Sequence, residues 1–182
     1  MIKLITSNPK KYEDFQKELD FLQIELKIIS ENLPEIQTED IVENIIYKAK
    51  EAEKRYNEPV FVDDSALFTE QYKSFPGVNT KLILKQLGKD GFEKLFIDSN
   101  KKAKMVTVIG ISIKGEVFTF IGEVKGKLDF SREVKNPKMI LSDIFIPNNT
   151  KENIFYHRLN ALNKLKKEIK DIKTNIKENY EK

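Results

Sequence analysis

The sequence predicts an α/β fold with a mixed β-sheet, and three patterns support this prediction. In the first third of the chain, short β-branched runs alternate with amphipathic helical segments, as in parallel strands joined by helices. Two β-rich segments then follow one another across Lys114-Gly115, which indicates an antiparallel hairpin. A long segment with helical periodicity comes last. We therefore expect one mixed sheet flanked by helices.

The length and composition suit a single domain over residues 1–182. Hydrophobic residues make up 40% and charged residues 34%, which provides one core under a charged surface. The net charge is only +3 and the two signs are mixed along the chain, which argues against a tail that binds polyanions. No cysteine is present, and there is a single histidine, so disulfides, thiol nucleophiles and zinc sites with several Cys or His ligands are excluded. No apolar run approaches the roughly 20 residues that span a bilayer, so we expect a soluble, cytoplasmic protein without membrane contact.

Strands and helices are expected to alternate in the first 62 residues. The β-branched run 2–5 predicts a strand, and the charged amphipathic stretch 10–21 predicts a helix. Alternating apolar residues in 23–29 predict a half-buried strand. Apolar residues at three- and four-residue steps predict a helix that starts at Thr38 or Glu39 and ends at Tyr56. The continuous apolar run 60–62 predicts a strand that is buried on both faces.

A turn at 75–77 is expected to lead into two short helices, separated by a glycine-containing break at 88–91. The hairpin that follows has its strands at 103–113 and 116–124, and its length suggests a ribbon that extends from the sheet. An irregular segment is expected between Pro137 and Pro147. The final helix is expected over about 157–178, with an end that frays. The two short helices cover 80–87 and 91–97.

Polar residues between the first strand and the first helix form a candidate phosphate site. Free backbone N–H groups and the positive end of the helix dipole favour an anion at such a junction. The hydroxyls of Thr6 and Ser7, the amide of Asn8 and the ammonium of Lys11 add further donors. The alternative is an ordinary capping turn with solvated lysines.

Asp63 and Asp64 directly follow the buried run 60–62, at the carboxyl end of a predicted core strand where open α/β sheets bind ligands. Adjacent carboxylates repel each other, so we expect a positive group beside them. Mg²⁺ prefers carboxylate and phosphate oxygens and keeps several waters, so it is a suitable cation. The alternative is a turn in which one aspartate caps the next segment.

Two further clusters could carry function. Asn44 and Lys48 lie four residues apart on one face of a predicted helix, with Glu43 beside them. A glutamate there could bind a metal and a lysine could bind phosphate, although ordinary surface charges would give the same pattern. His157 and Arg158 begin the last helix and could contact a nucleobase or a phosphate. The alternative for that pair is a simple helix end.

The order of these motifs resembles the inosine triphosphate pyrophosphatase family, whose members hydrolyse non-canonical purine nucleoside triphosphates. The resemblance covers most of the chain, and six ordered segments carry it. These segments are Thr6-Ser7-Asn8-Pro9-Lys10-Lys11, Val42-Glu43-Asn44-Ile45-Ile46-Tyr47-Lys48-Ala49, Val62-Asp63-Asp64-Ser65-Ala66-Leu67, Phe75-Pro76-Gly77-Val78, Gly122-Glu123-Val124-Lys125-Gly126, and Tyr156-His157-Arg158 followed by Ala161-Leu162.

The resemblance implies an elongated fold of two lobes with the active cleft between them, and a homodimer. It also implies Mg²⁺-dependent hydrolysis of ITP, dITP and XTP between the α- and β-phosphates, which yields the monophosphate and pyrophosphate. Glu43 and Asp64 would bind Mg²⁺, Lys48 would stabilise phosphate charge, and Asp63 or Asp64 would activate water. The implied substrate-binding residues are Thr6, Ser7, Asn8, Lys11, Ser65, Asp143, His157 and Arg158.

The departures from the family concentrate in the segment that reads the base. Met139-Ile140-Leu141-Ser142-Asp143 replaces the usual Phe-Gly-Tyr-Asp-Pro, so the stacking Phe is missing and Asp143 would read the base only if one residue is deleted. Tyr156 and Glu152 stand where the family has Ser and Lys. A pyrophosphatase with different or broad base specificity is therefore one alternative. The other is a binding protein with reduced catalysis, or one that binds nucleic acid, although lysines interleaved with glutamates argue against nucleic acid.

Overall fold

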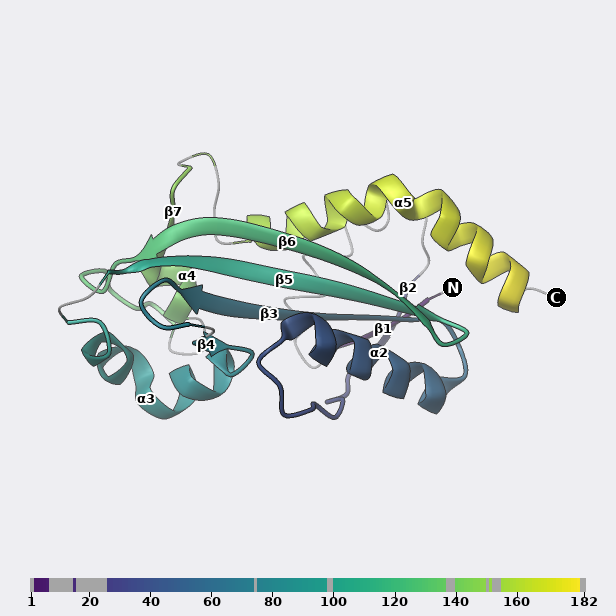
Figure 1. Ribbon diagram of the computed structural model, residues 1–182, viewed down its shortest axis with the longest axis horizontal. Coiled ribbons are helices and arrows are strands. Elements are labelled where there is room, and N and C mark those ends of the chain that lie inside the picture. The colour runs from purple at the N-terminus through teal and green to yellow at the C-terminus, as the bar shows by residue number, and fades with distance from the viewer. Residues whose placement is uncertain are drawn as a thin grey trace.

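One long sheet runs through an elongated molecule and has helices on both faces (Figure 1). The computed structural model describes residues 2–6, 15, 26–73, 75–97, 100–136, 140–149, 151 and 155–180. In these ranges seven strands form one sheet in the order β2-β1-β3-β5-β6-β7, with β4 paired to β3. Parallel and antiparallel pairs both occur, so the predicted mixed sheet is confirmed.

Short parallel strands form one side of the sheet. β1 (Ile2–Ile5) lies between β2 (Leu26–Ile29) and the beginning of β3 (Val60–Thr69), and is parallel to both. β1 and β3 pair only at Val60 and Phe61, so most of β3 extends past the end of β1. This extension leaves one edge of β3 without β1 as a neighbour, next to the site described below.

β3 is longer than the strand predicted over 60–62, and the prediction that the two aspartates follow its end is wrong. Asp63 and Asp64 lie within β3, because β5 (Lys102–Ile113) pairs with β3 over ten residues. Hydrogen bonds to β5 therefore keep the chain extended where β1 has already ended. The aspartates do lie beyond the carboxyl end of the parallel part of the sheet.

β5 and β6 (Glu116–Leu128) form the predicted hairpin. Lys114 and Gly115 both have positive φ, 51° and 84°, as a two-residue turn of type I′ requires. The hairpin is not a ribbon that leaves the sheet, since β5 lies inside it between β3 and β6. β5 is buried along nearly its whole length because it has a pairing partner on each side and helices pack on both of its faces.

The segment between Pro137 and Pro147 is more regular than expected. From residue 140 it forms a short helix, α4 (Ile140–Ile144), and then the edge strand β7 (Phe145–Pro147). β7 pairs with β6, which gives its backbone the hydrogen bonds that an irregular segment would lack. The other short strand, β4 (Pro76–Gly77), pairs with the end of β3.

Within the described part of the chain, three longer helices cover the sheet. α2 (Ile41–Tyr56) begins slightly later than predicted, because Asp40 caps it by accepting hydrogen bonds from the N–H groups of its first turn. α3 (Thr80–Lys94) is interrupted at Gly88, as predicted, where φ is 63°. α5 (Tyr156–Tyr180) matches the predicted last helix to within two residues at each end. The helix predicted over 10–21 lies outside the described residues except for Phe15.

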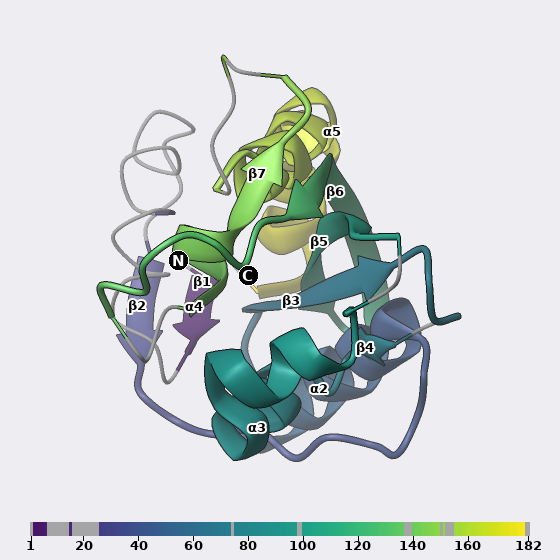
Figure 2. The same ribbon diagram turned by 90° about the vertical axis from the view of Figure 1, so that its left-hand side faces the viewer.

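Figure 2 shows α5 on one side of the sheet and α2 and α3 on the other. The core between the sheet and α5 includes Phe61, Ile109 and Leu165, and the core under α2 includes Ile45, Val62 and Val108. A third cluster fills the end near α3 and α4. None of the helices in the described ranges combines the length and the apolar character that a membrane crossing requires.

Candidate active site

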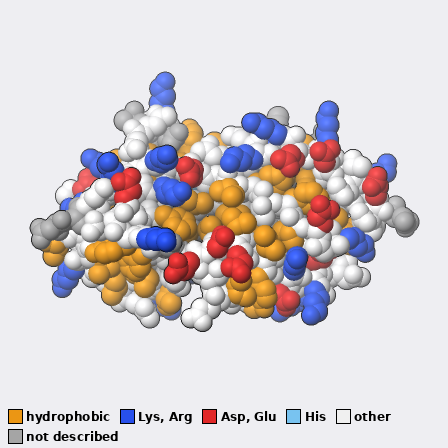
Figure 3. Space-filling view, in the orientation of Figure 1, with side chains coloured by type: hydrophobic (Ala, Val, Ile, Leu, Met, Phe, Trp, Pro, Cys, Tyr) orange, Lys and Arg blue, Asp and Glu red, His pale blue; other side chains and the backbone are white. Residues whose placement is uncertain are grey.

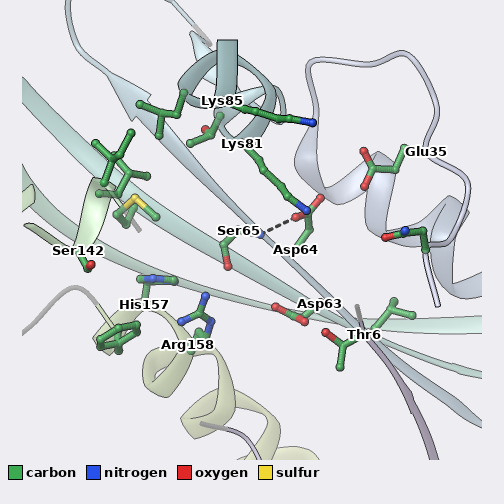
Figure 4. A pocket seen from close by; sticks show the side chains of 18 of the residues that line it. Thr6, Glu35, Asp63, Asp64, Ser65, Lys81, Lys85, Ser142, His157 and Arg158 are labelled. Atoms are coloured by element: carbon green, nitrogen blue, oxygen red, sulfur yellow. Dashed lines mark hydrogen bonds between the residues drawn. The ribbon is translucent and has the colours of Figure 1, made fainter. Parts of the chain in front are cut away.

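A cavity of about 1040 Å³ lies at the exposed edge of β3, beyond the end of β1. It is bordered by the end of β1, the loop before α2, α3, α4 and the start of α5. Figure 4 shows Glu35 and Thr6 toward one end of it and Ser142 and His157 toward the other. Segments that are far apart in the sequence thus meet around the middle of β3.

Asp63 and Asp64 both line this cavity, although they leave β3 on opposite faces. Asp63 lies on the α5 face and is buried, at 7% exposure. Asp64 lies on the α2 face, where its Oδ2 accepts a hydrogen bond from Asn44 Nδ2 at 3.2 Å. Both can face one ligand because, among the described residues, no strand pairs with this edge of β3 between β1 and β4.

The positive group expected beside the aspartates is Lys48 on α2. Its Nζ lies 3.5 Å from Asp64 Oδ2 and donates a hydrogen bond to Glu35 Oε1 at 2.6 Å. Burial lowers the pKa of Lys48, but the charges of Asp64 and Glu35 and the hydrogen bond to Glu35 outweigh that effect and raise the pKa above 10.5. The lysine therefore stays protonated at neutral pH, and its ammonium group holds the carboxylates of Glu35 and Asp64 close to each other.

Three side chains link β3 to the start of α5. Ser65 Oγ lies 2.7 Å from Thr107 Oγ1 on β5, and Thr107 Oγ1 is hydrogen bonded to Nδ1 of His157. Thr107 is fully buried and His157 is 1% exposed, so this contact fixes the orientation of the imidazole. Ser65 also donates its backbone N–H to Asp64 Oδ1 at 2.8 Å. One hydrogen-bonded chain thus joins Asp64 to His157.

The protein matches the family model described as the Ham1 family over residues 2–168. The chain belongs to the Ham1 family. It is 35% identical to a dITP/XTP pyrophosphatase of Korarchaeum cryptofilum over 144 residues, which cover 79% of this chain and 77% of that one. It is 38% identical to a dITP/XTP pyrophosphatase of Thermococcus kodakarensis over 125 residues, 68% and 67% of the two chains. The family resemblance that the motifs indicated is therefore confirmed.

Solved structures of Ham1 proteins have the same fold. A HAM1 protein from Coxiella burnetii superposes with a TM-score of 0.71 at 23% identity, over 94% of this chain and 100% of that one. A nucleoside-triphosphatase, dITP/XTP pyrophosphatase, from Mycobacterium abscessus superposes with a TM-score of 0.59 at 24% identity, over 94% and 98%. At 23% and 24% sequence identity, these superpositions show that the fold is shared.

The cavity brings together many of the residues that the motifs predicted. Two predicted residues do not line it: Glu43 is exposed and accepts a hydrogen bond from Thr38 Oγ1 at 2.5 Å, and Asp143 accepts one from the N–H of Lys135 at 2.9 Å. Three others lie outside the described residues, namely Ser7, Asn8 and Lys11. The predicted residues that line the cavity are Thr6, Lys48, Asp63, Asp64, Ser65, His157 and Arg158.

The cavity also contains residues that the motifs did not indicate. Lys81 and Lys85 of α3 point into it opposite the aspartates (Figure 4), and their four-residue spacing on one helix face was a usable signal. Glu35 precedes α2 in a polar stretch without periodicity, so no local pattern marked it. Ser142, in the segment that departs from the family motif, and Phe155, just before α5, line the other end.

Proposed function

We propose that this Ham1-family protein is a nucleoside triphosphate pyrophosphatase that converts dITP, ITP and XTP to the monophosphate and pyrophosphate. The observation that carries this proposal is the arrangement of Glu35, Asp64 and Lys48 at one end of a cavity whose other end holds His157. A triphosphate needs cationic and metal-binding groups, and its base needs a separate polar and apolar pocket. The names of the two relatives, both dITP/XTP pyrophosphatases, support dITP and XTP as substrates.

The carboxylates fit a magnesium ion. Glu35 and Asp64 both lie within 3.5 Å of the single ammonium of Lys48, so they can share one cation. Within the described ranges, no three Asp, Glu or His side chains come together as a metal site, so phosphate oxygens and water would complete the coordination. Because Glu43 does not line the cavity, we propose Glu35 and Asp64 as the ligands in place of Glu43 and Asp64. Bound Mg²⁺ would neutralise phosphate charge.

The chain's own residues supply the remaining requirements of the reaction. With a metal bound, Lys48 would be free to donate from Nζ to a phosphate oxygen, and Lys81 and Lys85 can do the same from the opposite wall. Asp63 lines the cavity from the α5 face of β3 and would orient the attacking water. These roles need only positioning and charge, which is what phosphoryl transfer requires.

Pyrophosphate release tests the proposal directly. With Mg²⁺, purified protein should hydrolyse dITP and XTP faster than dGTP, dATP or pyrimidine triphosphates. Asp64→Asn should lower kcat/KM by about 100-fold, equivalent to about 2.7 kcal/mol, with an unchanged circular dichroism spectrum. Asp171→Asn, at an exposed position on α5, is the matched control. An Asp64→Asn enzyme with full activity would contradict the assignment.

The base preference has a specific alternative. Asp143 points to the backbone of Lys135 and the described lining residues at that end include Ser142 instead, so the base pocket differs from the family pattern. Equal rates for canonical and deaminated purines would favour a pyrophosphatase of broad specificity.

Nucleotide binding without hydrolysis would favour a protein with reduced catalysis. Steep salt-dependent binding to DNA or RNA would favour a nucleic-acid protein, but lysines and acidic residues are interspersed on the face in Figure 3.

We further propose that residues 1–182 form one domain, that the cavity is a cleft between two lobes, and that the chain forms a homodimer. The border of the cavity, with α3 on one side and the β1–α2 region on the other, supports the cleft. Light scattering after size exclusion tests the dimer. A substrate pool of free nucleotides agrees with a cytoplasmic location, which cell fractionation tests.

A further inference from the structure

We propose that Phe155 is the base-binding aromatic residue of this protein, and that with Arg158 it forms the wall on which a purine stacks. The inference rests on the proposed function, because it assigns the part of the same cavity that would hold the base.

The two ends of the cavity differ in chemistry. One end carries Glu35, Lys48 and Asp64 with Lys81 and Lys85 above them, so it suits a charged phosphate chain. The other end is largely apolar and suits the flat faces of a purine ring. Its apolar lining includes Met105, Val134, Ile140, Leu141 and Phe155, which belong to or pack against one hydrophobic cluster.

Phe155 is the one aromatic side chain among the described residues that line the cavity. Its ring is partly buried against the core cluster of α3 and α4, which restricts its motion. The Arg158 guanidinium carbon lies 5.6 Å from the ring centroid, within range of a cation–π contact. Ring and guanidinium are both planar, and both line the cavity, so together they offer a stacking surface to a base.

Polar atoms for the edge of the base lie close to this wall. His157 is adjacent in sequence to Arg158, and Figure 4 shows Ser142 at the same end of the cavity. Thr107 is hydrogen bonded to Nδ1 of His157, which holds the imidazole in place beside this wall. Stacking on Phe155 with edge contacts to Ser142 and His157 would favour a purine over a pyrimidine, because the larger ring buries more area.

Steady-state kinetics and binding of ligand fragments test Phe155. Phe155→Leu keeps apolar volume but removes the ring, and it should raise KM for dITP about tenfold while kcat changes by less than about twofold. Binding of dIMP, measured by calorimetry, should weaken by a similar factor. Binding of inorganic tripolyphosphate, which has no base, should stay within about twofold of wild type. Phe155→Tyr should restore dITP kinetics.

The matched control is Tyr72→Leu, which removes an exposed aromatic ring that does not line the cavity. Its KM for dITP and its binding of dIMP should equal those of the wild type. Wild-type KM for dITP in Phe155→Leu would overturn the inference. Equal weakening of dIMP and tripolyphosphate would overturn it too, because it would indicate a general structural role. If wild-type protein hydrolyses no triphosphate, the proposed function fails separately, and loss of dIMP binding in Phe155→Leu still decides the stacking role.

Discussion

Lys48 is the residue that contacts both carboxylates of the proposed metal site. Its ammonium is held by Glu35 at 2.6 Å and Asp64 at 3.5 Å, and its side chain is only 11% exposed. Burying a charge is costly unless partners compensate, so the two carboxylates and the lysine stabilise each other. A cation other than the lysine could use the same two carboxylates, which is why the cluster suits a metal.

Substitutions of Glu35 and Glu43 distinguish the two candidate metal ligands. We expect Glu35→Gln to lower kcat by about tenfold or more and to raise the Mg²⁺ concentration for half-maximal activity by a similar factor, because it removes one carboxylate from the cavity. Glu43→Gln should change both values by less than about twofold, since Glu43 is exposed outside the cavity. Rates measured across a Mg²⁺ titration provide both numbers. The reverse pattern would restore Glu43 as the ligand.

At the level of elements, the position of α5 depends on a glycine in β6. A Cβ atom at Gly122 would lie 2.1 Å from the carbonyl oxygen of His157 and 2.3 Å from the backbone nitrogen of Ala161. Only a residue without a side chain lets the helix approach the strand this closely. The contact is at the first turns of α5, so it also places His157 and Arg158 at the cavity.

Gly122→Ala should therefore harm both stability and activity. We expect the free energy of unfolding to fall by about 3 kcal/mol, because backbone atoms of α5 must move. KM for dITP should rise in the fraction that remains folded, since His157 and Arg158 move with the helix. Gly91→Ala is the control, because the three atoms nearest to its Cβ all belong to the Leu87 side chain, at 3.0 Å or more, and it should change stability by about 1 kcal/mol or less. Urea denaturation measures the free energy of unfolding of both variants. An equal loss in Gly122→Ala and Gly91→Ala would contradict the close packing of α5 on β6.

On the scale of the whole molecule, Glu53 connects the two helical layers at the hairpin end. It is on α2, and its carboxylate accepts hydrogen bonds from Ser112 Oγ at 2.5 Å, Gly115 N–H at 2.9 Å and Tyr180 O–H at 2.5 Å. Burial raises the pKa of Glu53, but these hydrogen bonds lower it more, so its pKa lies below 4.5. Burial and the bond to Glu53 raise the pKa of Tyr180 to about 12.

Stability should consequently depend on pH at both extremes. The depressed pKa means that the contribution of Glu53 is fully present above pH 4.5 and is lost as the pH falls through the folded-state pKa. Glu53→Gln should lower the free energy of unfolding by about 1–3 kcal/mol at pH 7, and the difference should shrink in acid. Glu51→Gln on the same helix should have little effect.

For Tyr180, stability should fall as the pH rises from 10 to 12. Unfolding curves from pH 3 to 12 test both signs.

Much of the fold could be predicted from local patterns. The hairpin follows from two β-rich runs across Lys114-Gly115, and the break in α3 follows from Gly88. The length of β3 and the strand β7 could not be predicted this way. Both depend on hydrogen bonds to strands distant in the sequence, β5 for one and β6 for the other.

The site divides in a similar way. Residue identities and short spacings were enough to predict the family, the mixed α/β class and a motif series that contains Asp63, Asp64 and Lys48. That Glu35 and Phe155 line the cavity, whereas Glu43 and Asp143 do not, follows from the folded arrangement of the segments. The reason is physical: a carboxylate or a ring reaches a cavity according to the direction of its side chain and the end of a neighbouring strand, and a single sequence encodes neither locally.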